Sequence, residues 1–313
     1  MSYPCGYGII RETLCINNHP AWGGAILEWM EKMRVKITAD STCDLEPEQI
    51  RQHDITVTPL HIGRNNGQDF RDGVDIDPTE LFRYADEDGV LCHTAAVSVG
   101  EYEAAFREAR EEADAVFHVN LGSGFSACYQ NAKIAAQEVD NVFVLDSQNL
   151  SSGMGHLVMD AAELAEAGER PEEILRILEE RRSKVETSFV LSTLRYMRMG
   201  GRCSAVAALG ANLLKLSPCI ELRSGAMGVG KKYRGSFEKV LTQYVHDRLD
   251  GRTDIDYRRI FITDCMAGEE NRMAVRKLVE ELADFDVVLN THAGCTVSNH
   301  CGPGCLGILF FRK

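Results

Sequence analysis

Short β-branched runs alternate with longer amphipathic stretches along most of this chain. From Val35 onward, "VKITA", "DITVTPL", "AVFHVNL" and "NVFVLD" have the composition of strands. Between them, "EYEAAFREAREEA" and "SACYQNAKIAAQEV" carry apolar residues at helical spacing. Strands that alternate with helices in this way are typical of a mostly parallel sheet with helices on its faces. The sequence therefore predicts an α/β fold.

A second set of strands begins at "SFVLSTL" and continues with "RRIFIT", "DVVLN" and the terminal "LGILFF". Before it, residues 156–184 are predicted to form two helices, with Pro171 in the first turn of the second, where a missing N–H costs least. A chain of 313 residues is long enough for two well-buried cores. We therefore expect two α/β domains, over residues 34–186 and 187–313.

Residues 1–33 precede the first strand and are predicted to be an N-terminal extension. They lack the charged segment followed by an apolar segment that a signal peptide needs, and Met33 is a candidate for the natural start. The eleven cysteines form no short disulfide framework, so reduced thiols in a cytoplasmic protein are expected.

Charge argues against nucleic acid as a partner, and hydropathy argues against an integral membrane protein. The formal net charge of -13 would repel nucleic acid, and the chain has no strong basic patch in sequence to offset it. No run of eighteen apolar residues occurs, so the chain is not expected to be an integral membrane protein.

The stretch "HVNLGSGFSACYQNA" is the first candidate for a ligand site. Gly122–Ala127 has the spacing of a dinucleotide fingerprint, and Asp146 follows about twenty residues later, where a ribose-binding acid would lie. The fingerprint normally occupies the first βα turn, however, and here at least two strands precede it. Ser126 stands at the predicted start of a helix, where free N–H groups favour an anion. The motif indicates an anion more firmly than a nucleotide, and an NAD(P)-binding oxidoreductase stays as the alternative.

A serine hydrolase would use Ser126 as nucleophile and His300 or His93 as base. The nucleophile elbow requires Gly-x-Ser-x-Gly, whereas this chain has Gly-Phe-Ser-Ala-Cys around Ser126. This interpretation is therefore disfavoured.

The segment "THAGCTVSNHCGPGCLG" contains residue types that bind zinc. It has no CxxC pair, and its Gly-Pro-Gly is explained as a tight backbone turn. We expect inert buried thiols rather than a metal site. The candidate ligands would be His292, Cys295, His300, Cys301 and Cys305.

Strand ends and one loop supply further polar groups. Asp40-Ser41 and Asp146-Ser147 each close a predicted strand, and ligands gather at the carboxyl ends of parallel strands. We expect these pairs, together with Thr94, to face one crevice, although Asp and Ser also cap helices. The Gly-Gly pair in "YMRMGGRCS" predicts a loop from which Arg202 projects into a cleft.

From about Val35 to its end, the chain resembles the DegV family of bacterial fatty-acid-binding proteins. Each matching segment is weak alone, but their order along the chain makes the set specific. The segments are "ITADSTCDL", "HTAAVS", "GSGFSACYQNA", "VLDS" with "SSGMG", "LRYMRMGGRCS", "KLSPCIEL" and "HCGPGCLG".

This resemblance implies a two-domain α/β protein with a ligand slot between the domains. A long-chain fatty acid such as palmitate or oleate would be bound there, its carboxylate anchored by Thr94 and Ser126. His300 and Arg202 would support the head group. The resemblance also implies a non-catalytic carrier without a cofactor, which presents the fatty acid to a separate kinase related to dihydroxyacetone kinases for acyl-phosphate formation. A binding module for another amphipathic acid is the remaining possibility.

The chemistry of these residues suits that role. A carboxylate removed from water is costly unless it is hydrogen-bonded, and hydroxyl donors, helix N-terminal N–H groups and a nearby cation meet that need. The tail needs a long apolar slot, for which "SSGMGHLVM" and "LGANLLKL" offer suitable side chains.

Overall fold

A four-stranded parallel sheet forms the first half of the chain. The computed structural model describes residues 33–207 and 216–313, so nearly all of the predicted N-terminal extension lies outside the described residues. The strands lie in the order β2-β1-β6-β7, and every neighbouring pair is parallel, as predicted. Their bounds are β1 Val35–Asp40, β2 Thr56–Thr58, β6 Ala115–Asn120 and β7 Val142–Asp146.

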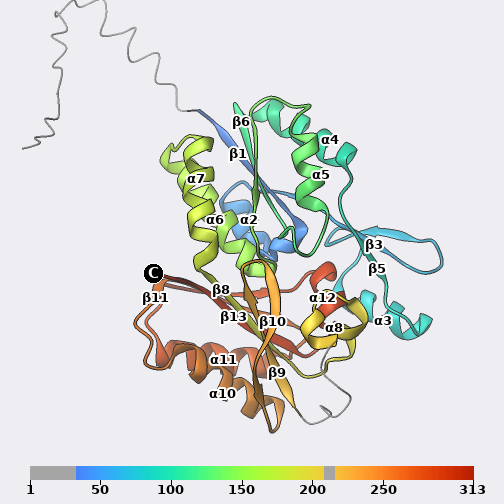
Figure 1. Cartoon of the computed structure of the whole chain (residues 1–313), viewed down its shortest axis with the longest axis vertical. Helices are drawn as coiled ribbons and strands as arrows, with labels where there is room; N and C mark the ends of the chain where they lie inside the picture. The colour runs from blue at the N-terminus through green and yellow to red at the C-terminus, as the bar shows by residue number, and fades with distance from the viewer. Residues whose placement is uncertain (1–32, 208–215) are drawn as a thin grey trace, which may run out of the picture. The chain divides into compact units, whose positions relative to one another are not determined.

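Helices cover both faces of this sheet (Figure 1). All residues of β6 are buried, as expected for a central parallel strand covered on both sides. Because side chains alternate along a strand, Val116 joins the apolar cluster of one pair of helices and Phe117 joins that of the other. The first pair is α4 Val99–Glu112 and α5 Cys128–Ala135, and the second is α6 Ser151–Ala167 and α7 Pro171–Arg181. Pro171 occupies the first turn of α7, as predicted.

The second half of the chain forms a six-stranded mixed sheet in the order β10-β9-β8-β13-β11-β12. Its pairs are antiparallel except for the parallel pair of β11 and β12. Two helices, α10 Phe237–Leu249 and α11 Glu269–Leu282, pack on this sheet through a shared apolar cluster. The strands are β8 Val185–Leu191, β9 Ser217–Arg223, β10 Ala226–Tyr233, β11 Ile255–Cys265, β12 Val287–His292 and β13 Cys305–Arg312.

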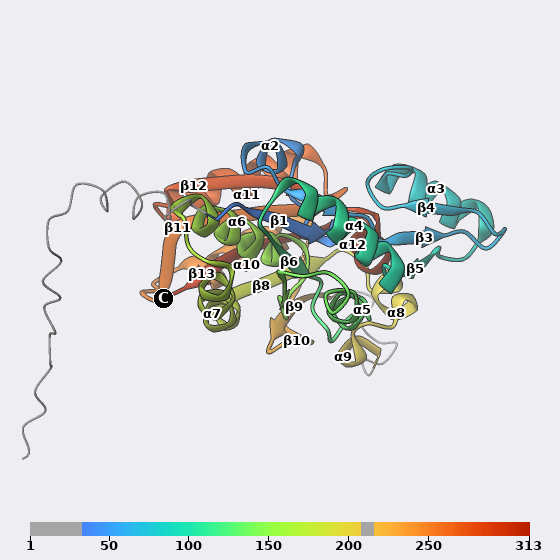
Figure 2. The same ribbon diagram turned by 90° about the horizontal axis from the view of Figure 1, so that it is seen from above.

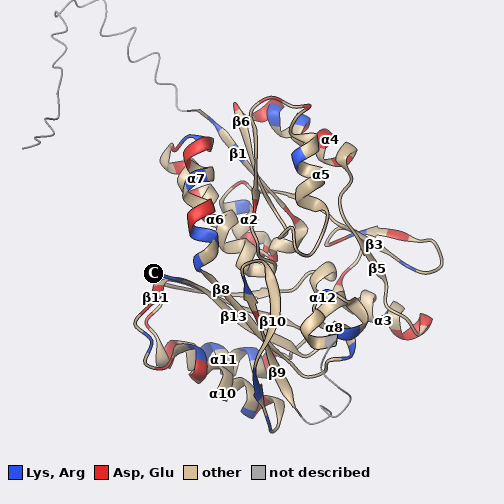
Figure 3. Cartoon of the chain, viewed as in Figure 1, with Lys and Arg blue, Asp and Glu red and all other residues tan. Residues whose placement is uncertain are grey.

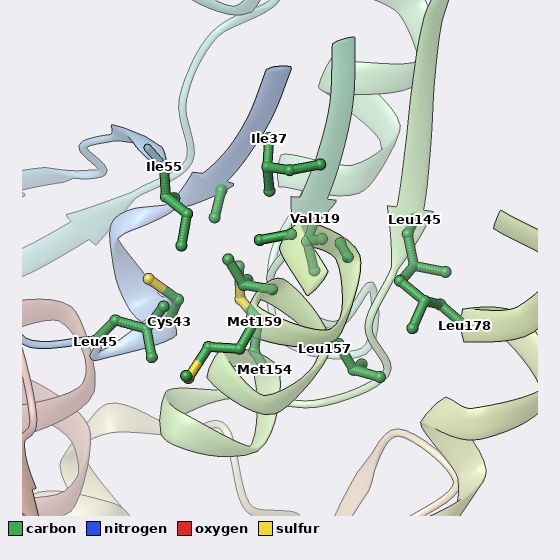
Figure 4. Close-up of a cluster of buried hydrophobic side chains, with 14 of the residues drawn as sticks. Ile37, Cys43, Leu45, Ile55, Val119, Leu145, Met154, Leu157, Met159 and Leu178 are labelled. Carbon is green, nitrogen blue, oxygen red and sulfur yellow. The ribbon is translucent and has the colours of Figure 1, made fainter. Parts of the chain in front are cut away.

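Helix α6 lies between the two sheets, and its residues from Ser151 to Ala162 are all buried. One apolar cluster joins it to Ile37 and Val119 of the first sheet (Figure 4). The same cluster includes Phe261 of the second sheet. Residues 34–313 consequently form one compact unit. The domain boundary near residue 186 stays a prediction; β8, the first strand of the second sheet, begins at Val185.

The three-stranded antiparallel sheet β4-β3-β5 was not predicted from the sequence. Figure 2 shows that it projects to one side of the rest of residues 34–313, together with α3. The strands of this sheet are only three residues long, which is too short for an alternating pattern to be recognised. The elements are β3 His61–Gly63, β4 Asp69–Arg71, β5 His93–Ala95 and α3 Pro78–Asp88.

Short helices complete the described chain: η1 Ser41–Cys43, α2 Pro47–Gln52, η2 Arg182–Lys184, α8 Arg195–Gly200, α9 Ser204–Ala207 and α12 Cys295–Cys301.

Acidic and basic residues alternate on the outer surfaces of α4, α7 and α11 (Figure 3). None of the helices in the described residues is both long and apolar enough to cross a membrane. The nine cysteines that the structure describes are buried free thiols.

Candidate functional site

All four predicted ligand-binding residues line one cavity of about 260 Å³. Thr94 comes from β5, Ser126 from the loop before α5, Arg202 from the loop between α8 and α9, and His300 from α12. Residues from both sides of the predicted boundary near 186 therefore form its wall. The remaining lining residues are mostly apolar: Thr42, Leu60, Ala95, Ala96, Leu121, Phe125, Ala127, Leu150, Phe189, Met197, Met227, Thr296, Val297 and Cys301.

Thr94 and His300 are hydrogen-bonded to each other, with 3.0 Å between Thr94 Oγ1 and His300 Nε2. Strand β5 pairs antiparallel with β3, so that Thr94 lies opposite Ile62, and this pairing fixes the position of the hydroxyl. Helix α12 begins where the backbone N–H groups of Cys295 and Thr296 donate to the Asp72 carboxylate. The two partners are thus held by separate parts of the fold.

The pKa of His300 is lowered to about 4, mainly because the imidazole is buried. The positive charge of Arg202 is the second cause of this lowering. The Gly200 backbone, against which the imidazole lies, acts in the opposite direction but is the weakest of the three causes. His300 is therefore neutral at pH 7, with one ring nitrogen as donor and the other as acceptor. The sequence left this protonation state open, and burial together with the nearby Arg202 favours the neutral form.

Arg202 lies in the predicted loop, which follows α8 and contains the Gly-Gly pair. Its Nη1 donates to the Gly200 carbonyl at 3.0 Å, and this bond orients the guanidinium group beside His300. A Cβ on Gly200 would collide with His300 Nδ1, so glycine at this position lets the end of α8 approach the imidazole. Arg202 is the one Lys or Arg among the described residues that line the cavity.

Ser126 lies two residues before α5, close to the predicted helix start. Its Oγ accepts a hydrogen bond from the Cys128 backbone N–H at 3.3 Å and lies 3.2 Å from Cys128 Sγ. The hydroxyl therefore stands where the first N–H groups of α5 are still free of helical partners. This geometry agrees with an anion-binding role for the loop.

Two buried carboxylates hold the loop that carries Ser126. Asp146 accepts from the backbone N–H of Ser123 at 3.0 Å and from its hydroxyl at 2.6 Å. Asp40 accepts from the Leu121 N–H at 2.7 Å and from Tyr102 Oη. The expectation that Asp40 and Asp146 face the crevice is therefore wrong, because neither residue lines the cavity. Both carboxylates instead accept hydrogen bonds from the loop that carries Ser126.

A smaller cavity of about 30 Å³ continues from the first, since Leu150, Phe189, Val297 and Cys301 line both. The segment "SSGMGHLVM", which was expected to offer suitable side chains for the slot, contributes little to it, because only Ser151 of this segment borders either cavity. Met154, Leu157 and Met159 instead pack in the core (Figure 4). The segment "LGANLLKL" lies almost wholly outside the described residues.

A third cavity, of about 410 Å³, lies on the other side of the predicted anchor. Thr94, Arg202 and His300 line both it and the first cavity. His93 and Met199 also line it, and both are exposed, so this cavity opens at the surface. The Thr94–His300 pair therefore separates a mostly apolar cavity from an outer one.

The competing interpretations find little support. The Asp146 carboxylate, the proposed ribose ligand of a dinucleotide site, already accepts hydrogen bonds from Ser123 and Gln148. His300, the proposed hydrolase base, is bonded to Thr94 rather than to Ser126. Among the described residues, no group of three or more His, Cys, Asp or Glu side chains is placed to bind a metal ion.

Comparison with known sequences gives a match over most of the chain. The family model described as "Uncharacterised protein, DegV family" matches residues 34–313. A DegV domain-containing protein of Deinococcus radiodurans is 30% identical over 277 residues, which cover 88% of this chain and 98% of that protein.

Solved structures share the fold. A DegV family protein from Thermus thermophilus, described by its fatty acid binding, has a TM-score of 0.79 at 30% identity and covers 90% of this chain and 100% of its own. DegV of Bacillus subtilis, described as a fatty acid binding protein, has a TM-score of 0.74 at 27% identity, with the same coverage. The chain belongs to the DegV family.

Proposed function

We propose that this protein is a cytoplasmic, non-catalytic carrier of a long-chain fatty acid, whose carboxylate is anchored by Thr94 and Ser126. The observation that carries the proposal is the composition of the 260 Å³ cavity, in which four polar side chains lie in an otherwise mainly apolar wall. An amphipathic acid needs this division, with donors for one end and apolar surface for the other. The fatty acid binding of the Thermus and Bacillus relatives supports the same ligand class.

The polar end of the cavity suits a single carboxylate. Thr94 and Ser126 supply hydroxyl donors, and Arg202 supplies one positive charge. Hydrogen bonds between charged and neutral groups are about twice as strong as those between neutral groups, which offsets the cost of burying the anion. Because His300 is neutral at pH 7, it contributes by orienting the Thr94 hydroxyl and not by its charge.

The apolar part of the cavity accounts for most of the expected affinity. At roughly 0.8 kcal/mol per buried methylene, some fourteen methylenes of a palmitate-length chain give a gross transfer free energy of about 11 kcal/mol before the costs of association. The head group then fixes the direction of the ligand. Leu150, Phe189, Val297 and Cys301 would guide the tail from the larger cavity toward the smaller one.

The surface cavity supports the presentation of the head group to a separate kinase. A carboxylate held at Thr94 would lie next to both cavities, and the outer one is lined by the exposed residues His93 and Met199. A kinase related to dihydroxyacetone kinases could phosphorylate the carboxylate there without removing the tail from its slot. The carrier itself would supply no catalytic group.

Ligand identification by denaturing mass spectrometry tests the proposal. The purified protein should release fatty acids of about sixteen to eighteen carbons, the chain length that the resemblance to the DegV family implies. Absence of any fatty acid, combined with no binding of added palmitate or oleate, would exclude the carrier function.

Two substitutions test the anchor. The double variant Thr94→Val, Ser126→Ala should bind palmitate more weakly than either single variant, because each change removes one hydroxyl donor and leaves the apolar wall in place. Val99→Ala on α4, at a residue that does not line the cavity, is a control for nonspecific loss of stability. Palmitate affinity equal to wild type in the double variant would remove both residues from the site.

A further inference from the structure

A separate cavity of about 490 Å³ lies at the edge of β8, outside the proposed fatty acid site. Its wall is built by η2, the turn between β9 and β10, the C-terminal part of α10 and the end of β13, and Thr187 lines both it and the cavity of about 30 Å³. Thr187 Oγ1 donates a hydrogen bond of 2.7 Å to Asn149 Oδ1, which also lines the larger of these two cavities. Nothing in the carrier function uses this cavity.

Five arginines from four different parts of the chain line the cavity. They are Arg182, Arg223, Arg248, Arg252 and Arg312. In a protein with a formal net charge of -13, such a concentration of guanidinium groups is a local exception. Positive charges collected from distant parts of the sequence repel one another, so they need counter-charges from the protein or from a ligand.

The protein supplies only part of that counter-charge. Glu221 pairs with Arg248 and Arg223, and Glu186 pairs with Arg252 at 2.6 Å. Asp254, outside the cavity lining, also pairs with Arg252 at 2.7 Å. Five guanidinium groups thus share three carboxylates, which leaves two positive charges in excess.

Arg182 and Arg312 carry this excess. Arg182 Nη1 donates to the Asp146 carbonyl at 2.7 Å, and no carboxylate of the described residues lies within ion-pair distance of it. Arg312 Nη2 donates to the Ser183 carbonyl at 2.8 Å, and its Nε is 3.9 Å from Glu186, which Arg252 already occupies. Both side chains are fixed by backbone carbonyls and retain donors for a ligand.

The inner wall is held in place before any ligand arrives. The side chains of Arg248 and Glu221 are each 14% exposed, and Arg248 Nε is buried without a hydrogen-bond partner among the described residues. A fixed guanidinium fork binds two oxygens of a carboxylate or phosphate with little loss of side-chain entropy.

We propose that this arginine cavity binds a small molecule that carries a phosphate or diphosphate group. The two excess positive charges match a dianion, and arginine presents paired N–H donors to phosphate oxygens. The volume of about 490 Å³ admits a ligand larger than a single phosphate ion. The site is independent of the acyl slot, although Arg182 contacts the backbone of Asp146, whose side chain supports the loop of Ser126.

Calorimetric titration of the full-length protein with inorganic pyrophosphate and with adenosine diphosphate tests the site. One equivalent of at least one probe should bind, more weakly as salt concentration rises because the attraction is screened. Tighter binding of the nucleotide would indicate a nucleotide ligand, and tighter binding of pyrophosphate would indicate a free diphosphate. Failure of both probes to bind at millimolar concentration would overturn the proposal.

Matched variants locate the binding. Arg223→Gln with Arg312→Gln should weaken binding by about tenfold or more, the usual effect of losing charge-assisted hydrogen bonds. Both side chains are substantially exposed, at 83% and 45%, so the variant should fold. The control removes two charges elsewhere, by Arg107→Gln with Arg176→Gln, at side chains that are each 57% exposed and outside the cavity. An equal loss in the control would show nonspecific attraction and overturn the proposal.

Fatty acid content measured on the same samples separates this site from the proposed carrier function. The arginine variants should retain bound fatty acid at the wild-type level. Loss of pyrophosphate binding with fatty acid retained supports two independent sites.

Discussion

Thr94 Oγ1 lies 3.0 Å from His300 Nε2, and the two residues are 206 positions apart in the sequence. Since His300 is neutral at pH 7, this bond has two forms. With the proton on Nε2, the imidazole donates to Thr94, and the Thr94 hydroxyl is free to donate to a ligand carboxylate. With the proton on Nδ1, the Thr94 hydroxyl donates to the imidazole instead. An anion in the cavity would favour the first form, so His300 would select the direction in which Thr94 donates.

His300 should make the protein less stable as the pH falls from 6.5 to 4. Its folded pKa of about 4 lies below the reference value of 6.5, so within this window the unfolded chain binds a proton that the folded chain does not. The contribution is complete above pH 6.5 and is lost toward pH 4, and its size is on the order of 3 kcal/mol.

Urea unfolding of wild type and His300→Gln at several pH values measures this contribution. The glutamine keeps a donor and an acceptor but does not titrate in this range. The wild type should lose more stability than the variant between pH 6.5 and 4, and parallel losses in the two proteins would contradict the assignment.

Gly124→Ala should destabilise the protein and weaken fatty acid binding. A Cβ at this position would lie 2.5 Å from the Gly225 carbonyl oxygen, in the turn between β9 and β10, and backbone atoms cannot move aside as a flexible side chain can. The strand β10 also carries Met227 of the cavity wall. We expect a loss of about 1–3 kcal/mol in the free energy of unfolding.

The control for this change is Gly100→Ala in α4, where an added Cβ meets nothing within 4 Å. Alanine has the higher helix propensity, so this variant should be neutral or slightly more stable. Thermal melting and palmitate titration of both variants give the comparison. A Gly124→Ala protein that melts and binds like wild type would show that the close approach has no consequence.

Asp146→Asn should weaken fatty acid binding through the loop of Ser126. The carboxylate accepts through Oδ1 from the N–H groups of Ser123 and Gln148 and through Oδ2 from the Ser123 hydroxyl. In asparagine an NH2 group replaces one oxygen, so the Ser123 hydroxyl can only accept from this side chain, and all three bonds lose their charged partner. Hydrogen bonds to a charged group contribute about 1.5–3 kcal/mol, compared with about 1 kcal/mol between neutral groups. Affinity should fall several-fold or more, while the apolar cavity remains.

Palmitate titration of this variant is compared with Asp114→Asn, which makes the same chemical change at an exposed acceptor of the Arg34 N–H. If both variants bind palmitate like wild type, Asp146 has no positioning role. An equal loss in both would indicate a general effect of charge.

The sequence predicted the parts of the fold whose pattern is local. The buried strands β1, β6 and β7 and the helices between them follow from β-branched runs and helical spacing, and Pro171 marked the start of α7. The small sheet of β3, β4 and β5 was missed because three-residue strands carry no periodicity. The role of α6 as a core helix shared by two sheets was also missed, since burial on all sides depends on tertiary packing.

The sequence likewise predicted some residues of the candidate site and missed others. Thr94, Ser126, Arg202 and His300 were recognisable because each lies in a short motif that resembles the DegV family, and all four line one cavity. Leu60, Phe125, Met197, Met227 and Val297 also line it and were not predicted. They are ordinary apolar residues in separate segments, and no signal in a single sequence distinguishes them from the core. The low pKa of His300 could not be predicted from the sequence, because it depends on the burial of the side chain and on the nearby Arg202.

Val297→Phe should shift the bound fatty acids toward shorter chains. Val297 is half-buried on α12 and lines both the main cavity and the small one beyond it, so a larger side chain there would block the passage between them. The carboxylate anchor lies at other residues of the main cavity and would be unaffected. Mass spectrometry of the ligands that copurify with the variant should show fewer chains of about sixteen to eighteen carbons than wild type and a larger share of shorter ones. Binding of laurate should persist while binding of stearate falls, and melting curves control for a general loss of packing. An unchanged ligand profile in a stably folded variant would place the tail on a path that does not pass Val297.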